Sequence, residues 1–169
     1  MKVYSIFLAC LLLAPSLPLA AADPVEVKIG FLNPTGASFL SAYTPAWTDA
    51  AEVAITELNE IYDGDYEFTL VEADSGCDAT TAATAAQSLI DHGVVGIAGA
   101  ACSGATLGAI EVAMDEGVPM ISYASTSPVI TDYYDDGYLF RVVPSDAQLG
   151  QAMVSVAHSA GFSNPTVVH

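Results

Sequence analysis

The chain has 169 residues, a length that suits one domain and is short for two. It carries 20 acidic residues against three Lys and Arg, which gives a formal net charge of −17. A surface this anionic repels nucleic acid and anionic lipid head groups, so neither is expected as a partner. Solubility in salty surroundings, where screening weakens the self-repulsion, accounts for the acidity.

The first 22 residues have the pattern of a secretory signal peptide. Lys2 is the only charge before Asp23, an apolar run covers residues 6–13, and Ala20–Ala22 precede the expected cleavage point. A membrane anchor is the alternative, but a span needs roughly 20 continuous apolar residues. We therefore expect an exported protein, with Cys10 lost together with the signal.

Short β-branched runs then alternate with longer Ala-rich stretches. The expected strands and helices, in chain order, are strand 27–32, helix 45–61, strand 66–71, helix 80–91, strand 94–98, helix 104–116, strand 119–123, extended segment 138–143, helix 146–161 and a strand from 166 to 169.

This βα alternation predicts an α/β fold, a doubly wound parallel sheet with helices on both faces, because parallel neighbours need a crossover that a helix fills. The sequence stops inside the expected strand 166–169. An intact domain seldom finishes in this way, so we expect a truncated chain.

In an open α/β sheet the ligand crevice lies beyond the carboxyl ends of the strands. Here three loops rich in small and hydroxyl residues follow the first, third and fourth strands. The candidate binding residues in these loops are Ser103, Ser125 and Thr126. A helix N-terminus at Ser103 favours an anion such as a carboxylate. Alternatively, Ser103 only caps that helix, and Ser125 and Thr126 only form a turn before Pro128.

Enzyme motifs are absent from the sequence. The glycine-rich stretch 96–104 lacks the dinucleotide spacing and has no phosphate-loop lysine, and the three histidines lack metal-ligand spacing. A hydrolase would place its serine between glycines, which Ser103 lacks. Asp74 and Asp78 are more readily explained as solvated loop carboxylates than as an acid–base pair. We expect no catalytic residue, metal or cofactor.

Two cysteines remain after the signal, Cys77 and Cys102. In an oxidising compartment their natural state is a disulfide, and two separate buried thiols are the alternative.

These residues together resemble the type I periplasmic solute-binding proteins of ABC transporters, the leucine/isoleucine/valine-binding family. The segments that carry the resemblance are Lys28–Gly30, Thr35–Gly36, Ala50–Asn59, Asp74 with Cys77–Asp78, Cys102–Ser103, Glu116–Ser122, Ser125–Pro128, Phe140–Arg141 and Pro144–Asp146, with Gln148 and Gly150.

The resemblance implies that Ser103 holds the ligand carboxylate and that Thr126 contacts both carboxylate and ammonium. Ser125 would frame this pocket through its backbone, and Tyr43 falls near an aromatic position that covers the ligand side chain. The Cys77–Cys102 spacing is similar to that of the disulfide in branched-chain amino acid binders. Tyr123 departs from the small residue or proline that the family places there.

The resemblance also implies the domain plan and the partners. Residues 23–141 would form the N-terminal solute-binding lobe, and residues 142–169 the hinge crossing and the start of an incomplete second lobe. Such a protein is not an enzyme; it captures a small polar solute, here an amino acid of branched-chain type, and presents it to ABC permease subunits. The alternative is the ligand-binding ectodomain of a sensory receptor. With one wall of the site only, this chain is expected to bind solute weakly.

Overall fold

The computed structural model describes residues 23–164 and 166. The expected signal peptide with Cys10, and all of the expected final strand except Thr166, lie outside the described residues. The elements are β1 (Val25–Asn33), η1 (Ser38–Leu40), α1 (Thr44–Ile61), β2 (Tyr66–Asp74), α2 (Ala79–Asp91), β3 (Val94–Ala98), α3 (Ser103–Asp115), β4 (Met120–Ser122), η2 (Pro128–Thr131), β5 (Leu139–Arg141) and α4 (Asp146–Ser159).

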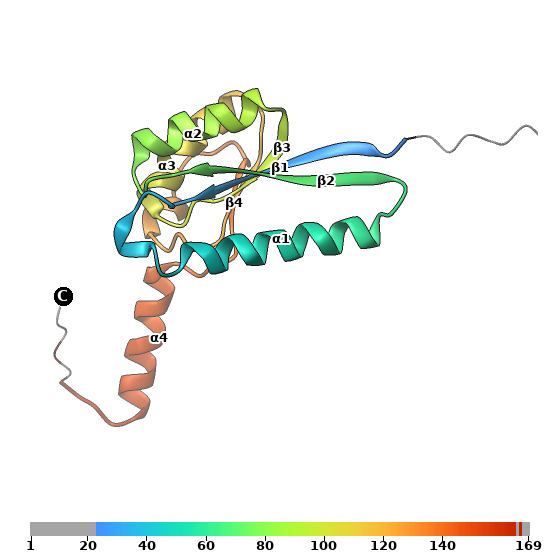
Figure 1. Ribbon diagram of the computed structural model, residues 1–169. Helices are drawn as coiled ribbons and strands as arrows, with labels where there is room; N and C mark the ends of the chain where they lie inside the picture. Colours follow the sequence, from blue (N-terminus) through green and yellow to red (C-terminus); the bar gives the residue numbers. More distant parts are fainter. Residues whose placement is uncertain (1–22, 165, 167–169) are drawn as a thin grey trace, which may run out of the picture.

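The strands form one five-stranded parallel sheet in the order β2-β1-β3-β4-β5. The predicted fold class is thereby confirmed: α1 lies on one face of the sheet, and α2 and α3 lie on the other (Figure 1). Apart from the final strand, which the described residues do not cover, the predicted elements all occur, with ends that differ by a few residues. β2 is longer than expected because its pairing with β1 continues to Asp74.

The hydrophobic core lies between the sheet and the α2–α3 layer. Leu32, Ile97 and Met120 point from the strands into this layer, and Leu89 and Ile110 meet them from the helices; each is at most 2% exposed. Alanines line the α2–α3 contact, which lets the helices approach closely. A Cβ at Gly108 would collide with the backbone of Ala79, so this approach requires glycine. The Ala-rich sequence thus becomes a tight helix pair.

The α1 side of the sheet is covered only in part. α1 packs on β1 and β2, whereas Val95, Ile121 and Phe140 of β3, β4 and β5 are between 44% and 57% exposed on the described chain. Parallel sheets usually have both faces covered. The described residues therefore leave an open apolar strip on this side.

α4 leaves the layered part of the molecule and projects away from it (Figure 1). Its start is fixed by a capping box, in which Ser145 and Gln148 bond each other's backbone N–H groups. Within the described chain no residue of α4 is buried. The helix is therefore held by its first turn and not by packing against the sheet.

Candidate functional site

The strand order reverses between β1 and β3, because the chain moves from β1 to β2 on one side and then crosses back to β3 on the other. The crevice of a doubly wound sheet lies at such a reversal, beyond the carboxyl ends of the strands. The loops predicted to carry the site leave this same edge from β1, β3 and β4.

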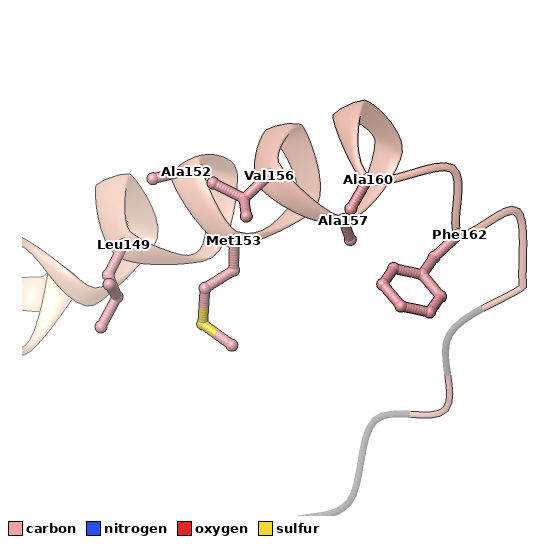
Figure 2. Close-up of a pocket in the computed structure, with 7 residues that line it drawn as sticks. All are labelled: Leu149, Ala152, Met153, Val156, Ala157, Ala160 and Phe162. Carbon is pink, nitrogen blue, oxygen red and sulfur yellow. The ribbon is translucent and has the colours of Figure 1, made fainter.

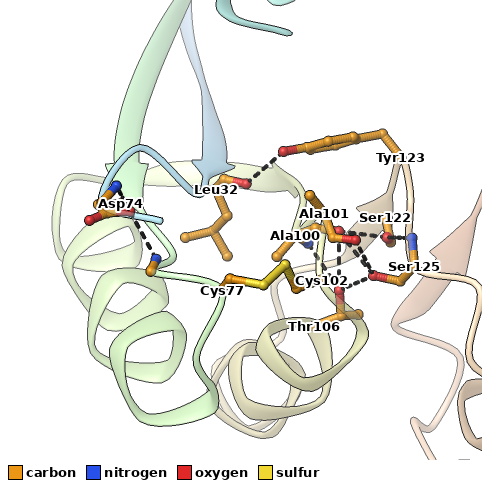
Figure 3. Close-up of a disulfide and its surroundings, with 12 residues drawn as sticks. Leu32, Asp74, Cys77, Ala100, Ala101, Cys102, Thr106, Ser122, Tyr123 and Ser125 are labelled. Carbon is orange, nitrogen blue, oxygen red and sulfur yellow. Dashed lines mark hydrogen bonds between the residues drawn. A yellow bond between two sulfur atoms is a disulfide. The ribbon is translucent and has the colours of Figure 1, made fainter. Parts of the chain in front are cut away.

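Buried hydroxyl groups join the loops that follow β3 and β4 (Figure 3). The Ala100 carbonyl accepts hydrogen bonds from Ser122 Oγ at 2.7 Å and from Ser125 Oγ at 3.1 Å. Ser125 Oγ also lies 2.8 Å from Thr106 Oγ1 of α3. Ser122, Ser125 and Thr106 are fully buried. The buried Ser125 hydroxyl therefore holds the β3 and β4 loops together, and only the backbone of Ser125 can face a ligand.

Ser103 is the first residue of α3 and not its cap. The N-cap is Cys102, whose sulfur is taken up by the disulfide and leaves the first helical N–H groups without a capping oxygen. Ser103 Oγ instead accepts a hydrogen bond of 3.2 Å from the backbone N–H of Ser127. The β3 and β4 loops thus meet at a half-buried hydroxyl beside a helix N-terminus, a place that favours an anion.

Thr126 lies next to the carboxylate of Asp146, which was not among the binding candidates predicted from the sequence. Its Oγ1 donates a hydrogen bond of 2.9 Å to Asp146 Oδ2, and its carbonyl accepts one of 2.9 Å from the Asp146 N–H. In the sequence, Asp146 was identified only as part of a helix start. Its position directly after Ser145, the N-cap of α4, was the one sequence feature that could have indicated it. Thr126 and Asp146 together offer oxygen acceptors to a cation such as an ammonium group.

Arg141 adds positive charge on the other side of this loop. Its guanidinium donates a hydrogen bond of 2.9 Å to the Ser127 carbonyl and a second bond to Thr131 Oγ1. The loop that carries Thr126 is therefore held between α3, α4 and β5.

The predicted disulfide is confirmed. Cys77 and Cys102 are bonded, with their Cα atoms 5.3 Å apart, and they join the turn before α2 to the start of α3 (Figure 3). The bond anchors the N-terminus of α3, on which Ser103 lies.

Asp74 and Asp78 have structural roles in the neighbouring loops. Asp74 Oδ1 accepts hydrogen bonds from the N–H groups of Gly36 at 3.0 Å and Gly76 at 2.8 Å, and Asp78 caps α2 through Thr81 N–H at 2.9 Å. Burial acts to raise the pKa of Asp74, but the hydrogen bonds from Gly36, Gly76 and Thr35 outweigh it and hold this pKa below its ordinary value. Asp74 thus fastens the β1–α1 loop to β2 as an ionised carboxylate.

Tyr43 lies at the other end of that loop, where it precedes α1, and it is 58% exposed. Asn33 holds this end through a bond of 3.2 Å from Nδ2 to the Thr44 carbonyl and one of 2.8 Å to Glu72 Oε1. In the described structure Tyr43 does not belong to the hydrogen-bonded group around Ser103. Its ring stacks on Trp47, 6.0 Å away between centroids.

An apolar hollow of about 460 Å³ lies along α4 (Figure 2), the helix that projects away from the layered part of the molecule (Figure 1). The residues that line it are Leu149, Ala152, Met153, Val156, Ala157, Ala160 and Phe162. It has no charged or hydrogen-bonding side chain with which to orient a polar solute. We therefore treat it as an unpartnered helix face and not as the binding site.

Residues 23–164 and 166 contain no group of three His, Cys, Asp or Glu side chains arranged to hold a metal ion. Over the same residues, none of the helices combines the length and the hydropathy that crossing a membrane requires.

Comparison with known proteins gives the family. Residues 26–169 match the model of the family described as "Periplasmic binding protein". Metabotropic glutamate receptor-like protein E of Dictyostelium discoideum is 30% identical over 148 residues, which are 88% of this chain and 17% of the receptor.

Two solved structures illustrate the similarity in fold. The substrate-binding protein of a branched-chain amino acid transporter of Streptococcus pneumoniae, in complex with isoleucine, superposes with a TM-score of 0.64 and 33% identity over 72% of this chain and 34% of that protein. A leucine-binding protein of Thermotoga maritima gives a TM-score of 0.67 and 30% identity over 78% of this chain and 37% of that protein.

The chain thus spans less than a fifth of the curated receptor and little more than a third of each solved structure. The matched residues include all three loops at the carboxyl edge of the sheet. The chain belongs to the periplasmic binding protein family, which is a family of extracytoplasmic, non-enzymatic binding proteins.

Proposed function

We propose that this protein is the extracytoplasmic substrate-binding component of an ABC importer that captures a small amino acid of branched-chain type. The observation that carries the proposal is the meeting of Ser103, Ser127, Thr126 and Asp146 at one edge of the sheet, through bonds of 2.9 to 3.2 Å. This edge offers donors for a carboxylate and acceptors for an ammonium group, which are the two charged groups that all free amino acids share.

In this proposal the ligand carboxylate lies at the start of α3. It accepts hydrogen bonds from the Ser103 hydroxyl and from the free N–H groups of the first helical turn, where the helix dipole adds a favourable field. The disulfide and the buried hydroxyls of Ser122 and Ser125 hold this turn in place before the ligand arrives. Preorganisation of this kind reduces the ordering cost of binding.

The ligand ammonium then lies towards Thr126 and Asp146. Thr126 Oγ1 can accept one N–H, and the exposed Asp146 carboxylate supplies the balancing charge. The carboxylate that Thr126 already contacts makes this end of the crevice negative, whereas the α3 end is positive. A zwitterion matches this separation of charge in one orientation only.

The same proposal divides the chain into two lobes. Residues 23–141 form the first lobe, and residues 142–169 form the hinge crossing and the beginning of the second. The projecting α4 and its apolar face support this division, because a helix with that face is suited to packing in a separate lobe. Closure of two lobes over the solute would complete the site.

The natural partners in this proposal are ABC permease subunits in the membrane, and the protein works on the periplasmic or outer side of the cell envelope. The isoleucine complex of the Streptococcus relative supports the solute class. The N-terminal signal pattern and the disulfide support the location.

A second candidate is the ligand-binding ectodomain of a sensory receptor with the same fold. The similarity to the Dictyostelium receptor-like protein favours it, since that match covers 88% of this chain. Both candidates use the same edge of the sheet, and they differ in what the bound form contacts afterwards.

A thermal-shift screen against free amino acids tests the proposal. A ligand at ten times its Kd stabilises the folded state by about 1.4 kcal/mol, so millimolar concentrations suffice even for one lobe. We expect leucine, isoleucine or valine to raise the Tm of the protein, and the Thr126→Val variant to lose this response.

Thr84→Val, an equivalent change on the exposed face of α2, is the matched control and should keep the response. Stabilisation by none of the amino acids would contradict the proposal.

A further inference from the structure

Arg141 carries a positive charge that pairs with no carboxylate among the described residues. The chain has 20 acidic residues, and the other described Lys or Arg side chain, Lys28, lies 3.7 Å from Glu26. The Arg141 guanidinium donates instead to two uncharged oxygens, the carbonyl oxygen of Ser127 and Oγ1 of Thr131. Surface ion pairing therefore does not account for this cation, and its two bonds lie in the loop that carries the candidate site.

The guanidinium joins β5 to both ends of the short helix η2. Ser127 is the N-cap of η2, and Thr131 is its last residue. Arg141 lies beside Ser122 in the β4–β5 register, and the buried Ser122 hydroxyl bonds the Ala100 carbonyl. A planar guanidinium holds two acceptors in one fixed geometry, which a single ammonium group does less well. Arg141 therefore fastens Ser127 to the sheet edge.

Ser127 in turn determines where the hydroxyl proton of Ser103 points. The Ser127 N–H donates a hydrogen bond of 3.2 Å to Ser103 Oγ, and Ser103 Oγ donates to no acceptor among the described residues. A serine hydroxyl has one proton to donate and two lone pairs with which to accept. Because Ser127 occupies a lone pair, the Ser103 proton points away from Ser127 and remains free for a ligand.

The peptide group between Thr126 and Ser127 is held at both of its polar ends. Its N–H donates to Ser103 Oγ, and its carbonyl oxygen accepts a hydrogen bond of 2.9 Å from the Asp146 N–H. Arg141 holds the next carbonyl along the chain, that of Ser127, at 2.9 Å. A rotation of this segment would strain all three bonds together, so the guanidinium opposes any turn of the Ser127 N–H away from Ser103.

We propose that Arg141 is a positioning residue for the ligand carboxylate. Through the Ser127 carbonyl it keeps the Ser127 N–H on Ser103 Oγ, and it thereby keeps the Ser103 proton available to the ligand. This inference rests on the proposed function, which places the ligand carboxylate at Ser103. Arg141 acts through Ser127 and does not touch the ligand, so its effect is confined to the carboxylate end.

A comparison of L-leucine with L-leucinamide isolates that end, because the amide keeps the ammonium group and the side chain but lacks the carboxylate. The Kd of each is measured by NMR titration at the amides of Ser103 and Thr126. Arg141→Met should lower the ratio of the leucinamide Kd to the leucine Kd by about two- to twelve-fold, the range of one net hydrogen bond. The leucine Kd should rise while the leucinamide Kd stays the same.

Two further readouts separate positioning from stability. A purely structural role would lower the Tm and weaken both ligands alike, which leaves the ratio unchanged. Arg141→Lys keeps the charge and a donor for the Ser127 carbonyl, so it should restore part of the ratio. In the free protein, hydrogen exchange at the Ser127 amide should be faster in Arg141→Met than in wild type.

Thr131→Val keeps Arg141 and removes only its second acceptor, on an exposed side chain, so it should lower the ratio less than Arg141→Met. It decides the matter where Arg141→Met does not fold. Lys28→Met is the matched control, because it removes the same charge from a residue whose salt bridge is with Glu26, and it should leave the ratio unchanged.

An unchanged ratio in Thr131→Val and in folded Arg141→Met, or an equal fall in Lys28→Met, would overturn the inference and leave the proposed function standing. Wild-type protein that binds leucine no more tightly than leucinamide, or that binds neither, would overturn both.

Discussion

Loss of the disulfide between Cys77 and Cys102 is expected to cost a large part of the stability of this protein. The two cysteines are 25 residues apart in sequence, and closing a loop of that length removes about 3.5 kcal/mol of chain entropy from the unfolded state. Domains of this size have a free energy of unfolding of about 5 to 15 kcal/mol. The double variant Cys77→Ala/Cys102→Ala should therefore unfold at a much lower urea concentration.

The assay is urea unfolding followed by far-UV circular dichroism, on the protein with and without reductant and on the double variant. The reduced protein and the double variant should lose a similar free energy of unfolding. A loss below 1 kcal/mol in both would refute the loop-closure reasoning.

A second double variant, Cys77→Ala/Cys102→Ser, tests the assignment of Cys102 as the N-cap of α3. A serine at this position can accept a hydrogen bond from the free N–H groups of the first turn, which is worth about 1 kcal/mol. The serine variant should be more stable than the alanine variant by that amount. It should also bind a carboxylate ligand more weakly, because the new cap competes for the same N–H groups. Equal stability of the two variants would show that the cap is assigned wrongly.

Three further predictions concern the loops and the surface. Ser125→Ala should lower the free energy of unfolding by about 1 to 3 kcal/mol, because it removes buried hydrogen bonds to Ala100 and Thr106, and a urea curve that matches wild type would contradict its role inside the fold. The pKa of Asp74 in the folded protein lies below its ordinary value of 3.8, so ionised Asp74 stabilises the folded state above pH 3.8. This stabilisation is lost as the pH falls through the folded-state pKa. Asp74→Asn should therefore make Tm depend less steeply on pH in acid. With a net charge of −17, the protein should gain Tm between low salt and 1 M NaCl, and a Tm independent of salt would exclude self-repulsion as a cost to folding.

The fold could be predicted because its signals are local. Alternation of β-branched runs with Ala-rich stretches determines the order of strands and helices, and parallel pairing then follows from the length of the crossovers. The disulfide could be predicted because only two cysteines remain after the expected signal. Element ends were less accurate, as at Ser103, where a disulfide-bonded cysteine takes the cap that a serine usually occupies.

The hydrogen-bond partners of individual hydroxyl residues could not be predicted, because they depend on contacts between segments distant in sequence. Ser125 and Thr126 are neighbours in one loop, yet one hydroxyl is fully buried against Thr106 and the other reaches Asp146, 20 residues further on. Tyr123 stood out in the sequence as a departure from the family pattern, but its bond to Leu32 joins positions 91 residues apart. No local pattern encodes such pairs.

The amide groups at the start of α3 give the most direct test of the central claim, that one edge of the sheet binds the charged end of an amino acid. NMR titration of the protein with L-leucine should shift the amides of Ser103, Gly104 and Thr126 with a single Kd. Ser103→Ala should raise that Kd about ten-fold, and Ser88→Ala, on the exposed face of α2, should not change it. Leucine binding that leaves these three amides unmoved, or that is as tight in Ser103→Ala as in wild type, would contradict the account.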